Sequence, residues 1–483
     1  MKRITEMTAG VLFAVAVCAG TVHAQDWYWI GGTSPNWADL SNWNDAADGS
    51  GSAPSAAGDL QNKDLMLLTT GTNLPSNQNI GGLAVSELMF DASLTSFTVS
   101  GEPIQLNHRF NTVGNPGSGQ TVTFENDLVK NASSSWIVRN KVTFSMEGEV
   151  SEIGGSRSHG GNHNGRVEFH GPVTISGGFR NNQSRAAFYG METTGTAPAA
   201  FDADYFRSGY GSWQFSSPDG DFYRYDLAAD AGMTTTENPG VFVDDDVVLT
   251  LNAPVTENNP GKSVTKWNDG VLVLNGANTF TGELSPARGL VILNGSLEPL
   301  DMIDPDHGSL DLAGNDVICD ELRFSNGSGF MSTGGIRNTD RTTTSTVDGD
   351  ITNMGSNPSV RQFGGPGNIR LTGDITDSSS GPHLAKTGAG TLILAGSSSH
   401  GGGVSIFGGE LALDYGADNS SKIGDTGLVA LNGSLRVTGN GATDTIETVG
   451  DLDIGSLANT STNTTRITDN GAGRNKETLG FDE

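Results

Sequence analysis

The chain has 483 residues, of which 68 are glycine and only 35% are hydrophobic, and its formal net charge is −28. This charge excludes nucleic-acid binding, which needs a cationic surface to displace the counterions of phosphate, and it disfavours contact with an anionic membrane. The apolar residues occur in short runs separated by Gly, Asn, Asp, Ser and Thr, so we expect many short strands joined by turns rather than disorder.

The N-terminal segment 1–24 has the features of a secretory signal peptide. A short positive segment precedes the apolar residues 11–19, and residues 22–24 place small side chains at the cleavage position. We predict cleavage after Ala24 and a secreted or cell-surface protein without a transmembrane helix in the mature chain. Cys319 is then the one remaining cysteine, and we expect it to be buried as a small apolar residue without a disulfide.

Period-two patterns of apolar residues recur along the mature chain, and helical periodicity is almost absent. The predicted strands include 83–85, 88–90, 122–124, 142–144, 167–169, 173–175, 271–274 and 391–394. Turn-forming Asn-Gly pairs lie between strands, and a positive φ costs little at such pairs. They occur at Asn275-Gly276, Asn294-Gly295 and Asn432-Gly433.

Internal repeats give the strongest indication of the architecture. The stretch that begins with Lys266 recurs 120 residues later at Lys386, with the same spacing of Gly, Leu, Leu and Gly. A shorter period of 19 residues separates the Leu- or Val-rich runs that begin at 272, 291 and 310. One such period suits one coil of a β-solenoid, since a single coil cannot bury its apolar face until another stacks on it. We therefore predict an all-β parallel β-helix with coils of about 19–20 residues; a β-sandwich array is the alternative.

Residues 266–295 and 386–416 resemble autotransporter-associated β-strand repeats, in which Lys-x-Gly-x-Gly-x-Leu-x-Leu-x-Gly precedes an Asn-Thr-Tyr-Thr-Gly-like turn. The first copy keeps this turn at residues 278–282, and the second copy has Ser-Ser-His-Gly-Gly at 398–402. The resemblance implies a right-handed parallel β-helix, like the passenger part of an exported bacterial autotransporter, and it implies no single activity. Residues 459–483 are too few and too polar for the translocator of such proteins, so we expect a passenger fragment or a simply exported member.

These features divide the chain into five parts. They are a signal peptide (1–24), a tryptophan-rich N-terminal cap with the first solenoid coils (25–110), an irregular β-rich region or insertion (111–250), a solenoid with the repeats (251–458) and a polar C-terminal tail (459–483).

Two groups of residues are candidate metal or catalytic sites. His159, His163 and His170 could bind Zn or Cu, but they complete no recognised ligand spacing, and solvated loop histidines are favoured. The run from Asp244 through Asp245 to Asp246 could supply the paired carboxylates of a glycan-active enzyme or ligands for Ca²⁺, and a solvated turn is favoured.

Two further groups have both a binding and a structural interpretation. Residues 304–308, with Asp301 and Asp311 nearby, resemble a calcium loop that lacks its terminal Glu, so a plain turn is favoured. The N-terminal aromatic residues could stack on sugars or close the end of the solenoid, and the second role is favoured. They are Trp27, Tyr28, Trp29, Trp37 and Trp43.

The sequence contains no nucleophile elbow, P-loop, Rossmann turn, zincin helix or kinase signature. We assign no catalytic, cofactor-binding or metal-binding residue and predict no cofactor. The leading hypothesis is an exported, non-enzymatic surface or extracellular protein that acts as a stalk or as an adhesin-like surface for a glycan or cell-surface ligand. The alternatives are a β-helix polysaccharide lyase or hydrolase, and an inert spacer or truncated passenger.

Overall fold

The computed structural model describes residues 27–67, 74–91, 96–114, 119–131, 135–139, 141–153, 158–162, 165–324, 335–352, 361–376, 384–400, 402–417, 419–424, 429–439, 445–449, 452–454, 466–469 and 477–481. These residues hold forty-five strands and three short 3-10 helices: η1 (Leu40–Asn42), η2 (Ala57–Leu60) and η3 (Met191–Thr193). The chain is thus all-β, as its period-two patterns predict. The predicted signal peptide lies outside the described residues.

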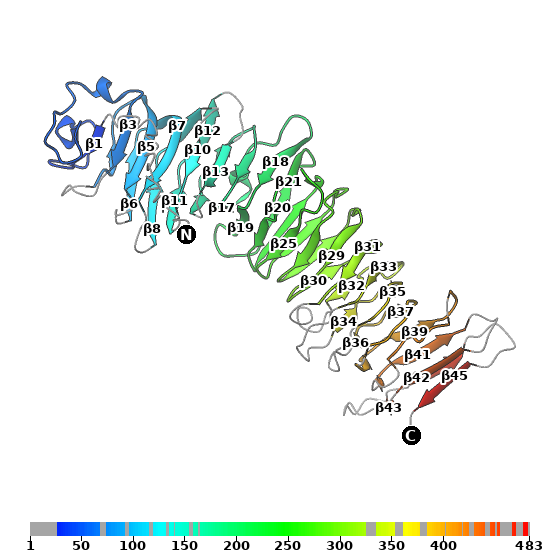
Figure 1. Cartoon of the computed structure of the whole chain (residues 1–483). Coiled ribbons are helices and arrows are strands. Elements are labelled where there is room, and N and C mark those ends of the chain that lie inside the picture. Colours follow the sequence, from blue (N-terminus) through cyan, green and yellow to red (C-terminus); the bar gives the residue numbers. More distant parts are fainter. Residues whose placement is uncertain are drawn as a thin grey trace, which may run out of the picture.

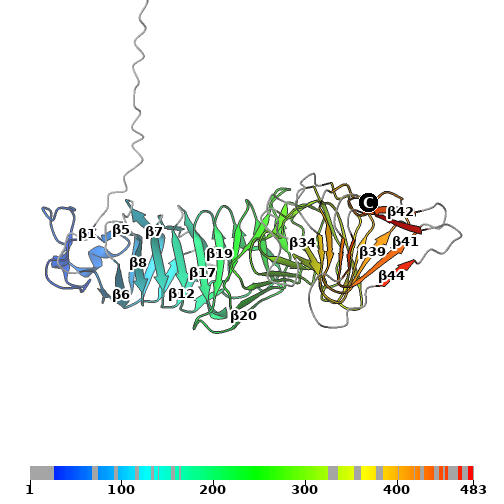
Figure 2. The ribbon, with the colours of Figure 1, turned by 90° about the horizontal axis from the view of Figure 1, so that it is seen from below.

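The strands stack as parallel coils into a long rod with the first coils at one end and the last at the other (Figure 1). Seen from below, successive coils lie side by side along the rod (Figure 2). Three sheets, here numbered 1 to 3, line the rod. Among the described strands, all pairings are parallel except that of β1 with β2. The predicted parallel β-solenoid is therefore confirmed.

Sheet 1 covers one side of the N-terminal half. It consists, in order, of β2 (Trp43–Asn44), β1 (Trp27–Trp29), β3 (Asp64–Leu67), β5 (Leu83–Asp91), β7 (Ile104–Val113), β10 (Ser135–Ile137), β13 (Ser158–Asn162), β16 (Phe179–Asn181), β18 (Asp202–Ser208), β21 (Ala231–Thr235) and β24 (Val255–Glu257). A branch that starts at β7 adds β9 (Leu128–Asn131), β12 (Val150–Ile153) and β15 (Val173–Thr174).

Sheet 2 follows the rod along almost its whole length. Its strands are β4 (Asn77–Gln78), β6 (Phe97–Gly101), β8 (Gln120–Phe124), β11 (Val142–Met146), β14 (Arg166–Phe169), β17 (Arg185–Tyr189), β19 (Ser212–Ser216), β22 (Gly240–Val243), β25 (Val264–Trp267), β27 (Glu283–Pro286), β29 (Leu300–Ile303), β31 (Val317–Leu322), β33 (Thr344–Asp350), β35 (Asn368–Leu371), β37 (Thr391–Leu394), β39 (Glu410–Asp414), β41 (Ser434–Thr438) and β44 (Arg466–Asp469).

Sheet 3 covers the C-terminal half. Its strands are β20 (Tyr223–Leu227), β23 (Val247–Leu251), β26 (Val271–Leu274), β28 (Leu290–Leu293), β30 (Ser309–Asp311), β32 (Ile336–Arg337), β34 (Arg361–Gly364), β36 (Leu384–Lys386), β38 (Val404–Ile406), β40 (Val429–Leu431) and β43 (Leu452–Ile454). The remaining strands, β42 (Thr445–Val449) and β45 (Glu477–Phe481), pair with each other.

The interior of the rod is a continuous stack of apolar side chains. Alternate residues of each strand point inward, and parallel pairing in register places each one directly against its counterpart in the next coil. In the N-terminal half these residues include many aromatic ones, such as Phe169 and Phe188, whose rings stack at 5.5 Å. In the repeat region they are aliphatic, as in the row formed by Leu272, Val291 and Leu310. Such stacking buries the core of each coil against its two neighbours.

The coil length varies along the rod. Leu284 pairs with Ile303, which is an advance of one predicted period. Ala186 instead pairs with Trp213 and Val317 with Val347, so the coils that begin at these two residues are longer. Residues 111–250 contribute strands to the same sheets as the rest of the chain, so the rod is continuous through them.

The two repeat copies occupy the coil in different orientations. In the first copy the tight corner at residues 268–270 links sheet 2 to sheet 3, through β25 and β26. In the second copy the tight corner at 387–390 links sheet 3 to sheet 2, through β36 and β37. Each copy also has a longer connection that carries an isolated β-bridge, Asn278 to Leu297 in the first copy and Ile375 to Ser398 at the second. This connection therefore lies on opposite sides of the rod in the two copies. Equivalent residues of the two copies therefore do not stack in one row.

The Asn-Gly pairs differ from the expectation of a positive φ. Neither Gly276 nor Gly295 has a positive φ. Glycine is needed at both positions because the preceding coil leaves no room for a Cβ. A Cβ on Gly295 would lie 2.0 Å from the carbonyl oxygen of Gly276 in the preceding coil. The side chains of Asn275 and Asn294 instead form a ladder, in which Asn294 Nδ2 donates to Asn275 Oδ1 at 3.0 Å.

Candidate functional site

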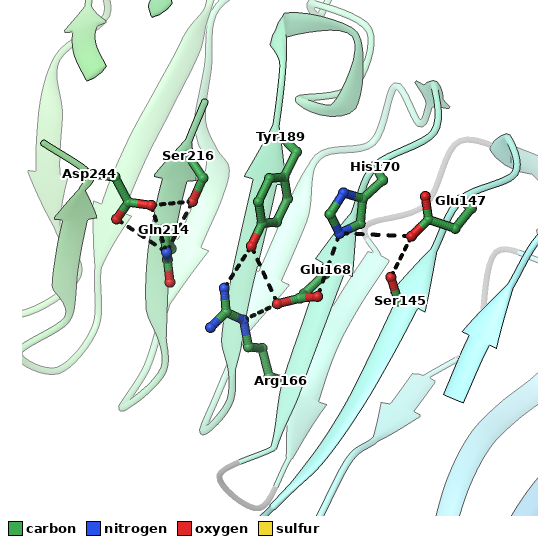
Figure 3. A network of polar contacts seen from close by, with 9 residues as sticks. All are labelled: Ser145, Glu147, Arg166, Glu168, His170, Tyr189, Gln214, Ser216 and Asp244. Atoms are coloured by element: carbon green, nitrogen blue, oxygen red, sulfur yellow. Dashed lines mark hydrogen bonds and ion pairs between the residues drawn. The ribbon is translucent and has the colours of Figure 1, made fainter. Parts of the chain in front are cut away.

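The outer face of sheet 2, between β11 and β25, presents rows of polar side chains. Parallel pairing in register places residues one coil apart next to each other, for example Tyr189 beside Ser216. The resulting network of nine residues on five neighbouring coils is drawn in Figure 3. They are Ser145, Glu147, Arg166, Glu168, His170, Tyr189, Gln214, Ser216 and Asp244.

One half of the network is centred on Glu168 (Figure 3). Its Oε1 lies 2.6 Å from Arg166 Nε, and its Oε2 lies 3.5 Å from His170 Nε2. Arg166 Nη2 also donates to the Tyr189 hydroxyl at 3.0 Å, and the Tyr189 ring stacks on the His170 ring at 4.0 Å. Each side chain is thus held by two others, which fixes its rotamer.

The electrostatics of this half favour the ionised form of Glu168. Burial alone would raise the pKa of Glu168, but the hydrogen bond from His170 and the charge of Arg166 outweigh it and lower the pKa. Burial and the Glu168 charge raise the pKa of Tyr189. A carboxylate with a lowered pKa and a phenol with a raised one are poorly matched to proton transfer near neutral pH.

The other half of the network fixes Asp244 (Figure 3). Ser216 Oγ donates to Asp244 Oδ2 at 2.6 Å, and Gln214 Nε2 lies 3.1 Å from the same oxygen. Asn268, which lies on the next coil, donates from its Nδ2 to Asp244 Oδ1 at 2.7 Å. Asp245 and Asp246, the other members of the aspartate run, are exposed in the turn between β22 and β23, so the three carboxylates do not converge.

An aromatic pair continues this face toward the repeat region. Phe242 and Trp267 stack on adjacent coils with ring centroids 6.1 Å apart, and 41% of Trp267 is exposed. The Arg185 guanidinium carbon lies 3.9 Å from the centroid of the Phe242 ring. Gly240 leaves room beside the pair, since a Cβ there would lie 2.8 Å from Phe242 Cε2. Phe242 is half-buried under the Arg185 guanidinium, so Trp267 is the exposed ring of the pair. A flat exposed aromatic ring beside fixed polar groups is suited to binding a sugar ring.

A groove of about 540 Å³ borders the same face at the start of the sheet 2 strands. Lys141, Arg166 and Arg185 line it from successive coils, together with Tyr210 and Ser212. Tyr210 is 74% exposed. Three cationic side chains therefore gather at one groove of a strongly acidic protein.

No sequence motif points to Arg166, Glu168, Tyr189 or the aromatic pair. The available signal was their outward position in period-two strands, but no spacing in the sequence shows which coils lie next to each other. Of the predicted histidine group, only His170 has a described side chain; the side chain of His159 and the whole of His163 lie outside the described part. Among described residues, no three or more His, Cys, Asp or Glu side chains are placed to hold a metal ion.

The remaining sequence candidates are dispersed. Asp311 forms an ion pair with Arg337 at 3.0 Å. Asp304 is buried in the connection between β29 and β30. Trp29, Trp37 and Trp43 pack edge to face in the core of the first coils and are fully buried, so their faces are closed to a ligand.

Cys319 is free and buried, as expected from the sequence. Burial raises the pKa of its thiol to about 12, so the reactive thiolate is scarce at neutral pH. We expect a mature chain beginning at Gln25 to react with a thiol reagent such as dithionitrobenzoate only after unfolding. Stoichiometric labelling of the folded protein within minutes would contradict this prediction.

The fold and this face together define a parallel β-solenoid protein with a polar and aromatic outer surface. Two segments, residues 264–298 and 384–413, match the model of the passenger-associated-transport-repeat family. The chain therefore carries two repeats of the autotransporter-passenger type. No curated protein and no solved structure matches the chain. In the described residues, no helix has the length and apolar character needed to cross a membrane.

Proposed function

We propose that this protein is an exported, non-enzymatic rod that binds polysaccharide on the outer face of sheet 2. The observation that carries the proposal is the exposed Trp267 ring, which stacks on the half-buried Phe242 beside a prearranged polar network. A polysaccharide needs an extended surface of this kind, with aromatic rings for its apolar sugar faces and fixed polar groups for its hydroxyls.

The state of the carboxylates supports binding rather than hydrolysis. Glu168 and Asp244 are both surrounded by side-chain donors from neighbouring coils. Glycoside hydrolysis requires one carboxyl group that keeps its proton near neutral pH, and the lowered pKa of Glu168 is the opposite condition. The repeats and the continuous rod fit a stalk that presents this surface away from the cell.

Trp267→Ala is expected to weaken polysaccharide binding at least tenfold, which corresponds to about 1.4 kcal/mol. The physical reason is the loss of an exposed ring that stacks on the sugar. Phe407→Ala is the matched control, because Phe407 is an aromatic residue of similar exposure, 42%, elsewhere on the rod. Glycan-array screening of the mature chain identifies a ligand, and calorimetry compares the variants.

Reducing-end and unsaturated-product assays on the same ligands test the non-enzymatic part of the proposal. We expect binding without product release. Reproducible depolymerisation, or unchanged binding by Trp267→Ala, would refute the proposed function.

A further inference from the structure

The groove beside the proposed glycan face contains an unusual pair of cations. Arg166 and Arg185 are direct cross-strand neighbours in β14 and β17. Both line the groove, and Lys141 lines it from the turn before β11. Like charges on directly opposite residues repel each other and destabilise a sheet. In a chain of net charge −28, this arrangement is not a consequence of composition.

The two arginines differ in how their charge is balanced. Arg166 has Glu168 at 2.6 Å. Within the described part of the chain, the Arg185 side chain forms no hydrogen bond and no ion pair, and its guanidinium stacks over Phe242. Burial and the neighbouring Arg166 charge lower the pKa of Arg185, and the Asp244 charge, which raises it, does not fully compensate; an anionic ligand would offset the remainder. Stacking fixes the plane of the guanidinium and leaves its N–H donors available at the edge.

We infer that the groove binds the carboxylate or sulfate group of an acidic polysaccharide, with Arg185 as the principal donor. The inference rests on the proposed glycan-binding function. A guanidinium presents two parallel N–H groups that match the two oxygens of such an anion. Arg185 both lines the groove and covers Phe242, so an anionic substituent in the groove places the sugar chain next to the Phe242–Trp267 pair. Tyr210 adds an exposed ring at the same groove.

The test compares ligands that differ only in charge. Oligogalacturonate and its fully methyl-esterified form separate a carboxylate from a neutral sugar, and dextran sulfate and dextran do the same for a sulfate. Calorimetry at low and moderate salt measures binding to the mature wild-type chain and to Arg185→Gln. Arg224→Gln is the matched control, because Arg224 also stacks over an exposed phenylalanine, Phe222, but on sheet 3.

We expect the wild type to bind at least one acidic polymer about tenfold more tightly than its neutral counterpart, with a preference that weakens as salt rises. Arg185→Gln should lose this preference while keeping its affinity for the neutral polymer, and Arg224→Gln should behave as wild type. The acidic polymer that binds, the uronate or the sulfate ester, identifies the anion. If Arg185→Gln does not fold by circular dichroism, Arg185→Lys and Lys141→Gln replace it, and each should lower the preference severalfold.

Two results would overturn the inference, and they differ in what else they affect. Equal binding of acidic and neutral polymers, unchanged by Arg185→Gln, removes the anion site and leaves the glycan-binding face intact. Failure of the wild type to bind any of the four polymers, or any glycan on an array, removes both the inference and the proposed function.

Discussion

Replacing Gly390 by alanine is expected to destabilise the rod by about 3 kcal/mol, because the new Cβ has no space. It would lie 1.9 Å from the carbonyl oxygen of Gly367 in the preceding coil. The N–H of Gly390 also donates to the carbonyl of Gly365 at 3.1 Å, so the backbone cannot move away without losing the pairing of the coils. A Cβ on Gly270, at the same position of the first repeat, would likewise lie 2.1 Å from the carbonyl oxygen of Asp244.

The matched control is Gly81→Ala, where no atom lies within 4 Å of the added Cβ. That change should alter the free energy of unfolding by less than about 0.5 kcal/mol. Urea unfolding followed by circular dichroism measures the global effect. Hydrogen exchange measures the local effect, since a solenoid can open coil by coil. Equal stability of the two variants, with unchanged exchange in β37, would show that the corner tolerates a side chain.

Lys266→Met is expected to change how stability depends on pH. Lys266 is fully buried in the interior, where its ammonium group donates to the carbonyl oxygens of Asn268 and, at 3.1 Å, of Arg288. Burial lowers its pKa to about 7, against an ordinary value of 10.5. Between these two values the unfolded chain holds a proton that the folded chain has lost, so raising the pH through this window stabilises the folded state.

Relative to Lys266→Met, the free energy of unfolding of the wild type should therefore rise by about 1.4 kcal/mol per pH unit between pH 7 and pH 10. Below pH 7 the difference should be constant. Lys386, the equivalent residue of the second repeat, has a pKa lowered by burial to about 8, so Lys386→Met should show a narrower window. Denaturant unfolding of each pair across the pH range measures the difference. A difference that stays flat from pH 7 to pH 10 would mean that the buried amine remains charged.

Much of the fold could be predicted from the sequence because coil stacking is a local, one-dimensional problem. Leu272 pairs with Val291 across one predicted period, and β26 and β28 begin and end close to the predicted runs. The repeat motif also has a direct physical basis. Its lysine satisfies carbonyl groups at the tight corner, and its second glycine, Gly270 or Gly390, admits the backbone of the preceding coil.

Little of the candidate site could be predicted in this way. Arg185 lies beside Arg166 after a coil as long as the repeat period, but Ser216 lies beside Tyr189 only after a longer coil. No spacing in the sequence predicts this longer coil, because its extra residues form a loop outside the rod. The Phe242–Trp267 pair could not be predicted either, because each residue is only one outward position of an ordinary strand. The two rings meet because β22 and β25 pair in register.

The sequence by itself determined the all-β coil, its period in the repeat region and the glycines and lysines of the corners, because each of these depends on contacts within one coil or with the next. Only the tertiary structure decided which outward residues share a face. It also decided that Lys266 lies in sheet 2 and Lys386 in sheet 3, although their motifs agree. The physical reason is that the rotation of each coil about the axis depends on the lengths of all connections before it, and these lengths vary without changing the pattern of any strand.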